Sequence, residues 1–304
     1  MARVLGCNMI QRVWSYSVSK DFKRMIHLRY LKIDVKHLPA WVCSLWNLET
    51  LYVRYETTVS SKIWTLKRLR HLYLSGGEKL PVILPRANRI ENLQSLGLKG
   101  YSVAYFVQII SLLNSGIFPR LRKLVLPCPT APAESVMLSS LHHLSNLHIL
   151  KLMYGFELPL DTNAFPSNLT KITLHLDAFR DPHPLMKTLG RLTNLQIVKL
   201  ISIDGFRFEL LNIGMGEFPQ LQVLHMRGIP VRQWRLERGA MPRLRHLVIG
   251  NCYKLSKLPE ELWSLTALGL VHVWWPSSKE LVKSLINVER RNGCKLIISD
   301  ASPS

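Results

Sequence analysis

Histidine and cysteine are the residue types in this sequence that could carry metal or thiol chemistry, and neither has the necessary spacing. His142, His143 and His148 do not form the HExxH pattern that aims two imidazoles at one zinc ion. No CxxC pair occurs among the five cysteines, which are Cys7, Cys43, Cys128, Cys252 and Cys294. We therefore expect these histidines at the surface, and we predict no metal site and no disulfide framework.

Motifs for catalysis or nucleotide binding are missing from the sequence as well. It contains no GxSxG elbow for a nucleophilic serine and no GxxxxGK[ST] loop to hold phosphates. Asn168-Leu169-Thr170 matches a glycosylation sequon, but Leu169 falls on a predicted core position, so we interpret the match as chance. The prediction is a protein without enzymatic activity and without a cofactor.

Composition indicates a folded and strongly basic chain. Its 304 residues include 40 Lys and Arg against 20 Asp and Glu, a formal charge of +20, and 47% are hydrophobic, which argues against disorder. The longest apolar run, residues 103–113, is too short and too interrupted to span a bilayer. The sequence also lacks a secretory signal, so we expect a reducing, cytoplasmic compartment, with the plasma-membrane periphery or the nucleus reached through partners.

A recurring hexamer, LxxLxL, organises the chain. From Leu28 to Leu268 ten intervals span 240 residues, a mean of 24 per interval, inside the range of about 20 to 29 for leucine-rich repeats. The eleven motif starts are Leu28, Leu48, Leu69, Leu93, Leu121, Leu147, Leu169, Leu195, Leu221, Leu244 and Leu268. Recurrence at a steady period is strong evidence for a solenoid.

The motif spacing predicts one short strand per repeat. The last two apolar positions are two residues apart, so they point to the core while the third, fifth and seventh positions point to solvent. Stacking such strands in parallel buries a continuous apolar column. The predicted fold is therefore an α/β leucine-rich-repeat solenoid, or horseshoe, with a parallel concave strand ladder and an irregular or short-helical convex side.

Two stretches indicate how the chain returns between strands, and the two ends differ from the middle. Leu38-Pro39 and Leu258-Pro259 each precede apolar residues at helical spacing, as in a short convex helix. Residues 277–280 form a capping box before an amphipathic helix closed by Gly293, and residues 295–299 predict a last strand. We predict a partial N-terminal repeat at 1–27, the repeat array at 28–275, and a C-terminal cap with a short tail at 276–304.

Five segments are specific enough to compare with a known family: residues 25–33 (MIHLRYLKI), 165–169 (FPSNL), 181–195, 216–221 (GEFPQL), and a tail with Trp234, residues 239–242 (GAMP) and Cys252. In these segments the sequence resembles the leucine-rich-repeat region of plant coiled-coil, nucleotide-binding, leucine-rich-repeat disease resistance proteins of the late-blight-resistance type. This resemblance implies recognition of a pathogen effector or a modified host protein and regulation of defence. Because the nucleotide-binding switch domain of that family is missing, we expect a truncated member.

The solvent-facing positions of the motif, which we call the ladder face, are the candidate partner-binding surface. Eight are Lys or Arg, five are His, and Asp34 is the only acid. We therefore predict a protein partner with an acidic surface: an effector, a host protein or an immune-receptor switch domain. The candidate residues are Tyr30, Lys32, Tyr52, Arg54, His71, Tyr73, Lys99, Lys123, Lys151, Lys171, Lys199, His225, Arg227, His246, His272 and Trp274, and His175 shares this face.

Tryptophans outside the motif have two predicted roles. Trp41, Trp46, Trp64 and Trp263 fall on convex segments and are expected to pack, whereas Trp274 and Trp275 before Pro276 are candidate exposed contacts.

Three other functions need to be weighed. Nucleic acid is disfavoured because no two Lys or Arg occupy adjacent strands of one ladder-face column and no nucleic-acid motif is present. A general scaffold for signalling or ubiquitin-ligase components stays open as the alternative, although an F-box-like segment is missing. An extracellular receptor ectodomain is disfavoured by the missing signal, cysteine caps and LxGxIP phrasing.

Overall fold

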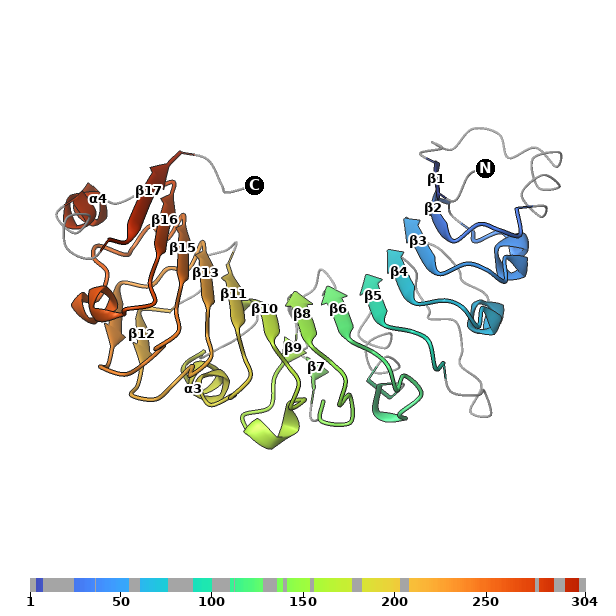
Figure 1. Ribbon diagram of the computed structural model, residues 1–304, viewed down its shortest axis with the longest axis horizontal. Coiled ribbons are helices and arrows are strands. Elements are labelled where there is room, and N and C mark those ends of the chain that lie inside the picture. The colour runs from blue at the N-terminus through green and yellow to red at the C-terminus, as the bar shows by residue number, and fades with distance from the viewer. Residues whose placement is uncertain are drawn as a thin grey trace. The chain divides into compact units, whose positions relative to one another are not determined.

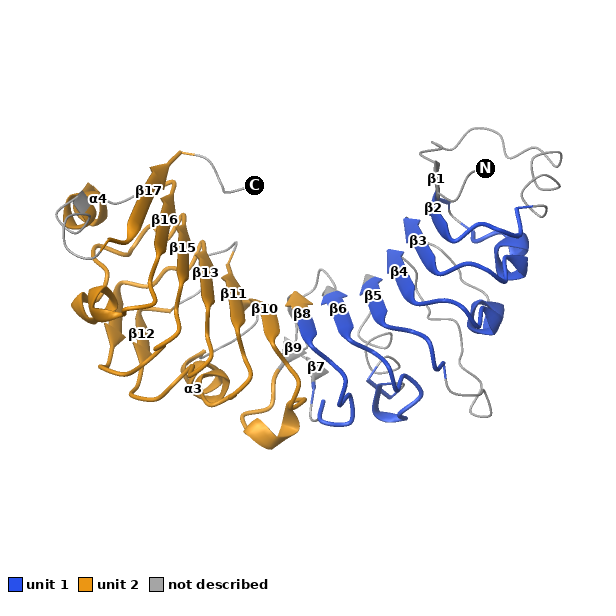
Figure 2. Cartoon of the chain, viewed as in Figure 1, with its two compact units in different colours: residues 1–151 blue, residues 152–304 orange. Residues whose placement is uncertain are grey.

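The computed structural model describes most of the repeat array in two compact units, Met1–Lys151 and Leu152–Ser304 (Figures 1 and 2). The described residues are 4–7, 25–35, 37–54, 61–75, 90–99, 110–111, 113–127, 136–138, 141–153, 156–176, 182–202, 208–276, 279–286 and 293–300. Each unit is built around parallel strands that follow one another along the chain.

In the first unit, six parallel strands pair in sequence order. They are β1 (Val4–Cys7), β2 (Tyr30–Asp34), β3 (Thr50–Arg54), β4 (His71–Ser75), β5 (Ser95–Lys99) and β6 (Lys123–Pro127). The register sets the second motif leucines side by side, in the column Leu31, Leu51, Leu72, Leu96 and Leu124. All five side chains are buried.

In the second unit the same arrangement repeats with six parallel strands. They are β10 (Lys171–His175), β11 (Ile197–Ile201), β13 (Val223–Arg227), β15 (His246–Gly250), β16 (Leu270–Trp274) and β17 (Lys295–Ser299). Strand β8 (Ile149–Met153) spans the boundary between the units, and the short strands β7 (Val136–Met137) and β9 (Phe156–Glu157) flank it in the chain.

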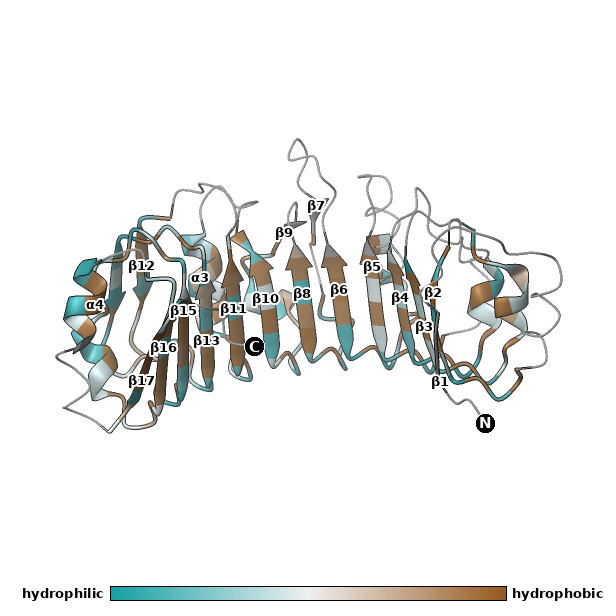
Figure 3. Ribbon diagram, turned by 90° about the horizontal axis from the view of Figure 1, so that it is seen from above, coloured by the Kyte–Doolittle hydropathy of each residue, from teal (hydrophilic) through white to brown (hydrophobic). Residues whose placement is uncertain are grey.

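Every strand predicted from the motif is confirmed, because each of the eleven begins two residues after its motif start. Strand β1 lies within the segment predicted as a partial N-terminal repeat and precedes the first motif start. Strands β2, β4, β8 and β11 alternate half-buried and buried residues, as expected when one face meets the core and the other meets solvent. In Figure 3, which colours each residue by hydropathy, the ribbons of β8 and β11 are mainly hydrophobic.

Several described return segments are short helices, as the sequence predicts for the two that follow Pro39 and Pro259. Pro39 precedes η1 (Ala40–Ser44), and Pro259 precedes η5 (Glu260–Ser264), in the same extended conformation, with φ of −60° and −63°. The other segments of this kind are η2 (Ser61–Thr65), η3 (Thr162–Ala164) and the helix α3 (His183–Gly190). Val42 and Leu262 are buried, so η1 and η5 pack against the core.

The helix and the last strand expected near the C-terminus are present where the structure describes this region. Helix α4 (Lys279–Ile286) buries Leu281 and Leu285, and β17 pairs with β16. Gly293 has a positive φ of 66°, which suits its predicted place between helix and strand. The first two capping-box residues, Ser277 and Ser278, and the end of the predicted helix at residues 287–292 lie outside the described residues.

A second sheet in the second unit has no counterpart in the sequence prediction. Strands β12 (Leu210–Ile213) and β14 (Gln233–Leu236) pair in parallel on the side of the unit away from the main strands (Figure 1). The buried Trp234 and Leu236 face the core from β14, so this part of the return side is strand rather than helix.

Candidate functional site

Tyrosines dominate the described ladder face of the first unit. The Tyr52 and Tyr73 rings stack with their centroids 4.8 Å apart, on neighbouring strands in direct register. A Cβ on Gly97, the next residue in that column, would overlap the Tyr73 ring, so this ring covers the glycine. The Lys123 ammonium sits 5.6 Å from the Tyr73 centroid, a cation–π contact. The stacked rings form an aromatic surface with the Lys123 cation beside it.

Charges on this part of the ladder face are partly balanced. Arg54 lies 3.8 Å from the carboxylate of Asp34, the only acid at these positions. His71 shares a hydrogen bond of 3.0 Å with the Ser95 hydroxyl, and its pKa is lowered by burial and by the neighbouring cations Arg70 and Lys123. A lowered pKa keeps His71 neutral at physiological pH. Tyr30 and Lys32 are half-buried on β2.

The described ladder face of the second unit carries cations and no acid. Lys171 begins β10, and Lys199 pairs in register with His225, two positions before Arg227 on β13. His246 and His272 follow on β15 and β16. The described ladder-face positions from β10 to β17 include no Asp or Glu. This face therefore presents a positive potential.

His225 lies in the middle of this basic surface. Burial first, and then the charges of Lys199, Arg227 and His272, lower its pKa to about 4. Its buried Nε2 has no hydrogen-bond partner within the described structure. His272 lies two strands from His225, on β16, and its Nε2 shares a hydrogen bond of 2.9 Å with the Ser299 hydroxyl. His225 is thus neutral at physiological pH, and the fixed charge comes from the lysines and Arg227.

Trp274 is not exposed, contrary to the sequence prediction. Its side chain is only 1% accessible, because the indole folds back over Gly250 on the neighbouring strand and Arg227 lies 5.4 Å above the ring. Glycine leaves a gap in the ladder face that a large ring fills. Trp275, the next residue, is 53% exposed, in agreement with its predicted place at the surface.

Two further candidate lysines are less fully defined. Lys151 is half-buried on β8, at the boundary between the units. The backbone of Lys99 ends β5, and its side chain lies outside the described part. His175 shares the ladder face but is buried.

The histidines and cysteines of the described residues do not gather into a group of three or more possible metal ligands, Asp and Glu included. His142 and His143 are exposed with their rings 3.8 Å apart, and His148 bonds to the Asn146 carbonyl at 2.6 Å. Cys252 is buried, which raises its pKa to about 12, and its thiol donates to the Gly250 carbonyl at 3.5 Å. This cysteine is a packing residue.

Sequence reasoning missed a ladder of side-chain hydrogen bonds immediately before the strands. The residue preceding a motif start is often Asn, and its Nδ2 donates to the backbone carbonyl two residues before the preceding motif start. The four bonds, of 2.7 to 2.8 Å, run from Asn47 to Ile26, from Asn92 to Lys67, from Asn146 to Pro119 and from Asn194 to Ser167. Recurrent Asn-Leu pairs in the sequence were the available signal.

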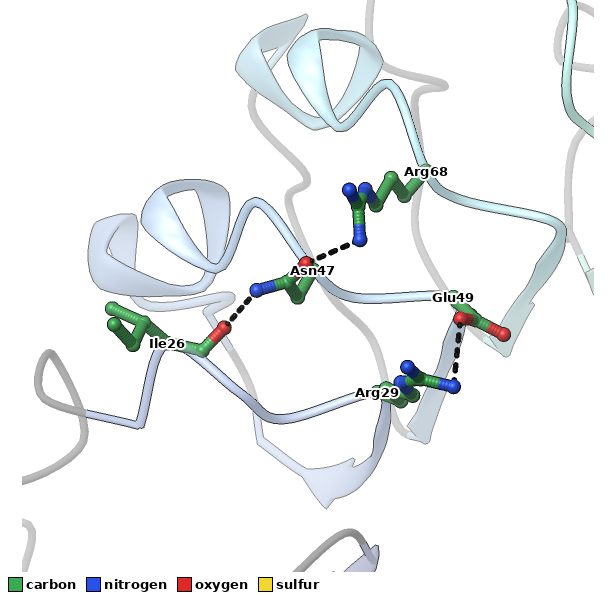
Figure 4. A network of polar contacts seen from close by, with 5 residues as sticks. All are labelled: Ile26, Arg29, Asn47, Glu49 and Arg68. Atoms are coloured by element: carbon green, nitrogen blue, oxygen red, sulfur yellow. Dashed lines mark hydrogen bonds and ion pairs between the residues drawn. The ribbon is translucent and has the colours of Figure 1, made fainter.

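Where arginine is the residue before a motif start, it adds to this series of side-chain hydrogen bonds. Arg68 donates to Asn47 Oδ1 at 2.7 Å, and Arg243 donates to Gln220 Oε1 at the same distance (Figure 4 shows the first). Trp46, predicted to pack, is instead 54% exposed at this turn, with the Arg68 guanidinium 5.5 Å from its ring. Trp41 is buried as predicted, while Trp64 and Trp263 are half-buried.

Comparison with known proteins agrees with this geometry. A family model described as "leucine-rich repeat region" matches residues 1–182, more than half of the chain. The chain belongs to the leucine-rich-repeat family. Among curated relatives, this leucine-rich-repeat chain is 26% identical to the putative late blight resistance protein homolog R1B-16 of Solanum demissum over 87% of its own length. It is 28% identical to a second late blight resistance protein homolog from the same plant over 86%.

The leucine-rich-repeat chain spans about a fifth of these relatives, 21% of the first and 20% of the second. A further match, among solved structures, is the internalin InlF of Listeria monocytogenes, at 14% identity and a TM-score of 0.49, with 94% of this chain and 89% of the internalin covered. Among the described residues, no helix is long and apolar enough to cross a membrane.

Proposed function

We propose that this chain is the protein-recognition module of a plant intracellular immune receptor, working in the cytoplasm and without catalysis of its own. Two findings support the proposal. The relatives at 26% and 28% identity are late blight resistance protein homologs, and the match runs along most of the chain. The strand ladder offers a broad solvent-facing surface, the usual binding surface of a solenoid.

We assign recognition to the ladder face. The observation that carries the proposal is that the described charged residues on its second-unit part are all positive. Lys171, Lys199 and Arg227 supply fixed positive charge, and no acid stands at the described ladder-face positions from β10 to β17. Charge of one sign raises the association rate of an oppositely charged partner and rejects like-charged ones. The partner therefore presents an acidic surface.

Aromatic side chains give the first unit a complementary role. The stacked pair Tyr52 and Tyr73 presents large, rigid contact area, with Lys123 beside it. Tyrosine and arginine are enriched among residues that dominate binding energies. An acidic effector, a modified host protein or an immune-receptor switch domain fits this combination. The implied mechanism is competition, in which a pathogen-derived or modified protein displaces a switch domain from the solenoid and releases defence signalling.

Affinity purification from infected plant tissue tests the proposal. The wild type is compared with a variant carrying Lys123→Glu, Lys151→Glu, Lys171→Glu and Lys199→Glu. A matched control changes four exposed cations away from the ladder face, Arg191, Arg235, Arg238 and Lys257, to Glu. We expect an immune-receptor switch domain or a pathogen protein with the wild type and the control, and its loss with the ladder-face variant. Equal recovery by all three folded proteins contradicts the proposal.

A further inference from the structure

The edge at which strands of the first unit begin has a chemistry different from that of the ladder face. We use the name turn edge for four residues around each of five motif starts, beginning two residues before the start and ending one residue after it. They are residues 26–29, 46–49, 67–70, 91–94 and 119–122. These segments precede β2 to β6, and their tips are turns. In Figure 3 the edge lies along the tails of those strand arrows.

The turn edge combines a strong excess of cations with exposed apolar tips. Its six cations are Arg29, Lys67, Arg68, Arg70, Arg120 and Arg122, all exposed, against two acids, Glu49 and Glu91. At equivalent tips of consecutive turns, Ile26 is 39% and Trp46 is 54% exposed. Cations beside protruding tryptophan and isoleucine are typical of surfaces that bind the headgroup region of a bilayer.

The polar contacts of this edge fix its turns and leave cationic groups available. Asn47 donates to the Ile26 carbonyl at 2.7 Å and accepts from Arg68, so these bonds link three consecutive turns (Figure 4). Arg29 lies 3.6 Å from the Glu49 carboxylate, so that pair is neutralised. The guanidiniums of Arg70 and Arg122 have no hydrogen-bond or ion-pair partner among the described residues.

We propose that the turn edge of the first unit docks on the surface of an anionic lipid bilayer. Trp46 and Ile26 would enter the interfacial region, while Arg70, Arg122 and their neighbours attract phosphate and carboxylate groups of the lipids. The protruding tips favour a bilayer over an acidic protein, since a fluid headgroup layer closes around protrusions without a preformed complementary surface. This surface is separate from the ladder face and does not depend on the proposed partner.

Co-sedimentation of the full chain with vesicles tests the docking. The vesicles contain phosphatidylcholine alone or with about 30% phosphatidylserine, a headgroup that gives the surface a negative potential. We expect binding to the anionic vesicles only, weakening as salt rises. Arg70→Gln with Arg122→Gln should lower the partition coefficient about 25-fold, because each cation near such a surface is worth roughly fivefold. Trp46→Ala should lower it about tenfold.

Matched variants separate docking from misfolding and from other anionic partners. Arg70→Lys with Arg122→Lys should restore binding, since charge is retained, and Arg235→Gln with Arg238→Gln in the second unit should leave binding unchanged. Equal sedimentation with both vesicle types, or equal loss in the second-unit control, overturns the proposal. The proposal is also overturned if the wild type does not sediment with anionic vesicles but binds a polyglutamate peptide through Arg70 and Arg122. The turn edge would then bind an acidic protein.

Discussion

The Trp274 indole occupies the place that a side chain at position 250 would fill, and Gly250 is what allows it. A Cβ at this position would overlap three atoms of the indole, Cε2, Cζ2 and Nε1. Arg227 completes the stack from the strand beyond, 5.4 Å from the ring. The first unit repeats the arrangement with Tyr73 over Gly97 and Lys123 as the cation. In both, a glycine in one strand orients an aromatic ring from the next.

Gly250→Ala should destabilise the second unit by about 1 to 3 kcal/mol, the usual cost of overfilling a packed site. The alanine would push Trp274 off Gly250 and disturb its contact with Arg227. Urea denaturation followed by circular dichroism measures the change. Gly269→Ala is the matched control, since the nearest atom to its Cβ, the Arg245 carbonyl oxygen, is 3.9 Å away. Equal stability of the two variants would show that the ring tolerates displacement at no cost.

Asn47→Ala should cost about 1 to 3 kcal/mol, because it removes the donor to the Ile26 carbonyl and leaves Arg68 without its 2.7 Å acceptor. Asn47 is buried, so water cannot fully replace these bonds. The exposed Asn212, on β12, is the control, and Asn212→Ala should change the free energy of unfolding by less than about 0.5 kcal/mol. If both variants unfold at the same urea concentration, the asparagine ladder does not stabilise the turns.

His225 should make stability fall on acidification between about pH 6.5 and pH 4. Its pKa drops from an ordinary value near 6.5 to about 4 in the folded chain, so over that window the unfolded state binds a proton that the folded state does not. The stabilisation is present above pH 6.5 and is lost as the pH falls to 4. Partial exposure screens the effect to the order of 1 kcal/mol.

The measurement is the midpoint of urea unfolding against pH for wild type and His225→Gln. The free energies of unfolding of the two proteins are obtained from these curves. Because glutamine does not titrate, the difference between them should change by that amount from pH 7 to pH 4. Asn212→Ala on β12, which removes no ionisable side chain, serves as the control and should leave the slope unaltered. A slope that persists in His225→Gln would assign the pH dependence to other groups.

Cys252 should resist alkylation until the chain unfolds. Burial raises its pKa to about 12, so almost no thiolate exists at neutral pH, and its side chain is inaccessible. The half-buried Cys43 and Cys294, whose pKa values are raised less, should react first. Mass spectrometry of peptides after brief iodoacetamide treatment orders the three. Modification of Cys252 at the rate of Cys43 in the folded chain would contradict its role as a packing residue.

The strands could be predicted from the sequence because their determinant is local. Each LxxLxL motif carries its own core residues at strand spacing, and Pro39 and Pro259 mark equivalent turns. The prediction for Trp274 was wrong because its environment is set by Gly250, 24 positions earlier in the chain and one strand away in the sheet. Strands β12 and β14 lack the motif, and their pairing joins residues such as Leu210 and Gln233 that no local pattern connects.

Trp46 shows the same limit at the turn edge. Its place on a convex segment predicted packing, yet the ring is exposed and lies against the guanidinium of Arg68, from the following repeat. Contacts between repeats, not the composition of one repeat, decide which side chains reach solvent.

The central claim is that the basic ladder face of the second unit recognises an acidic protein, and a titration of the partner recovered from plant tissue tests it most directly. Isothermal titration calorimetry compares the wild type, Lys171→Glu with Lys199→Glu, and the control Arg235→Glu with Arg238→Glu. The account predicts a Kd at least about tenfold weaker for the ladder-face variant alone, with wild-type affinity declining as salt rises. The same Kd for all three proteins would contradict it.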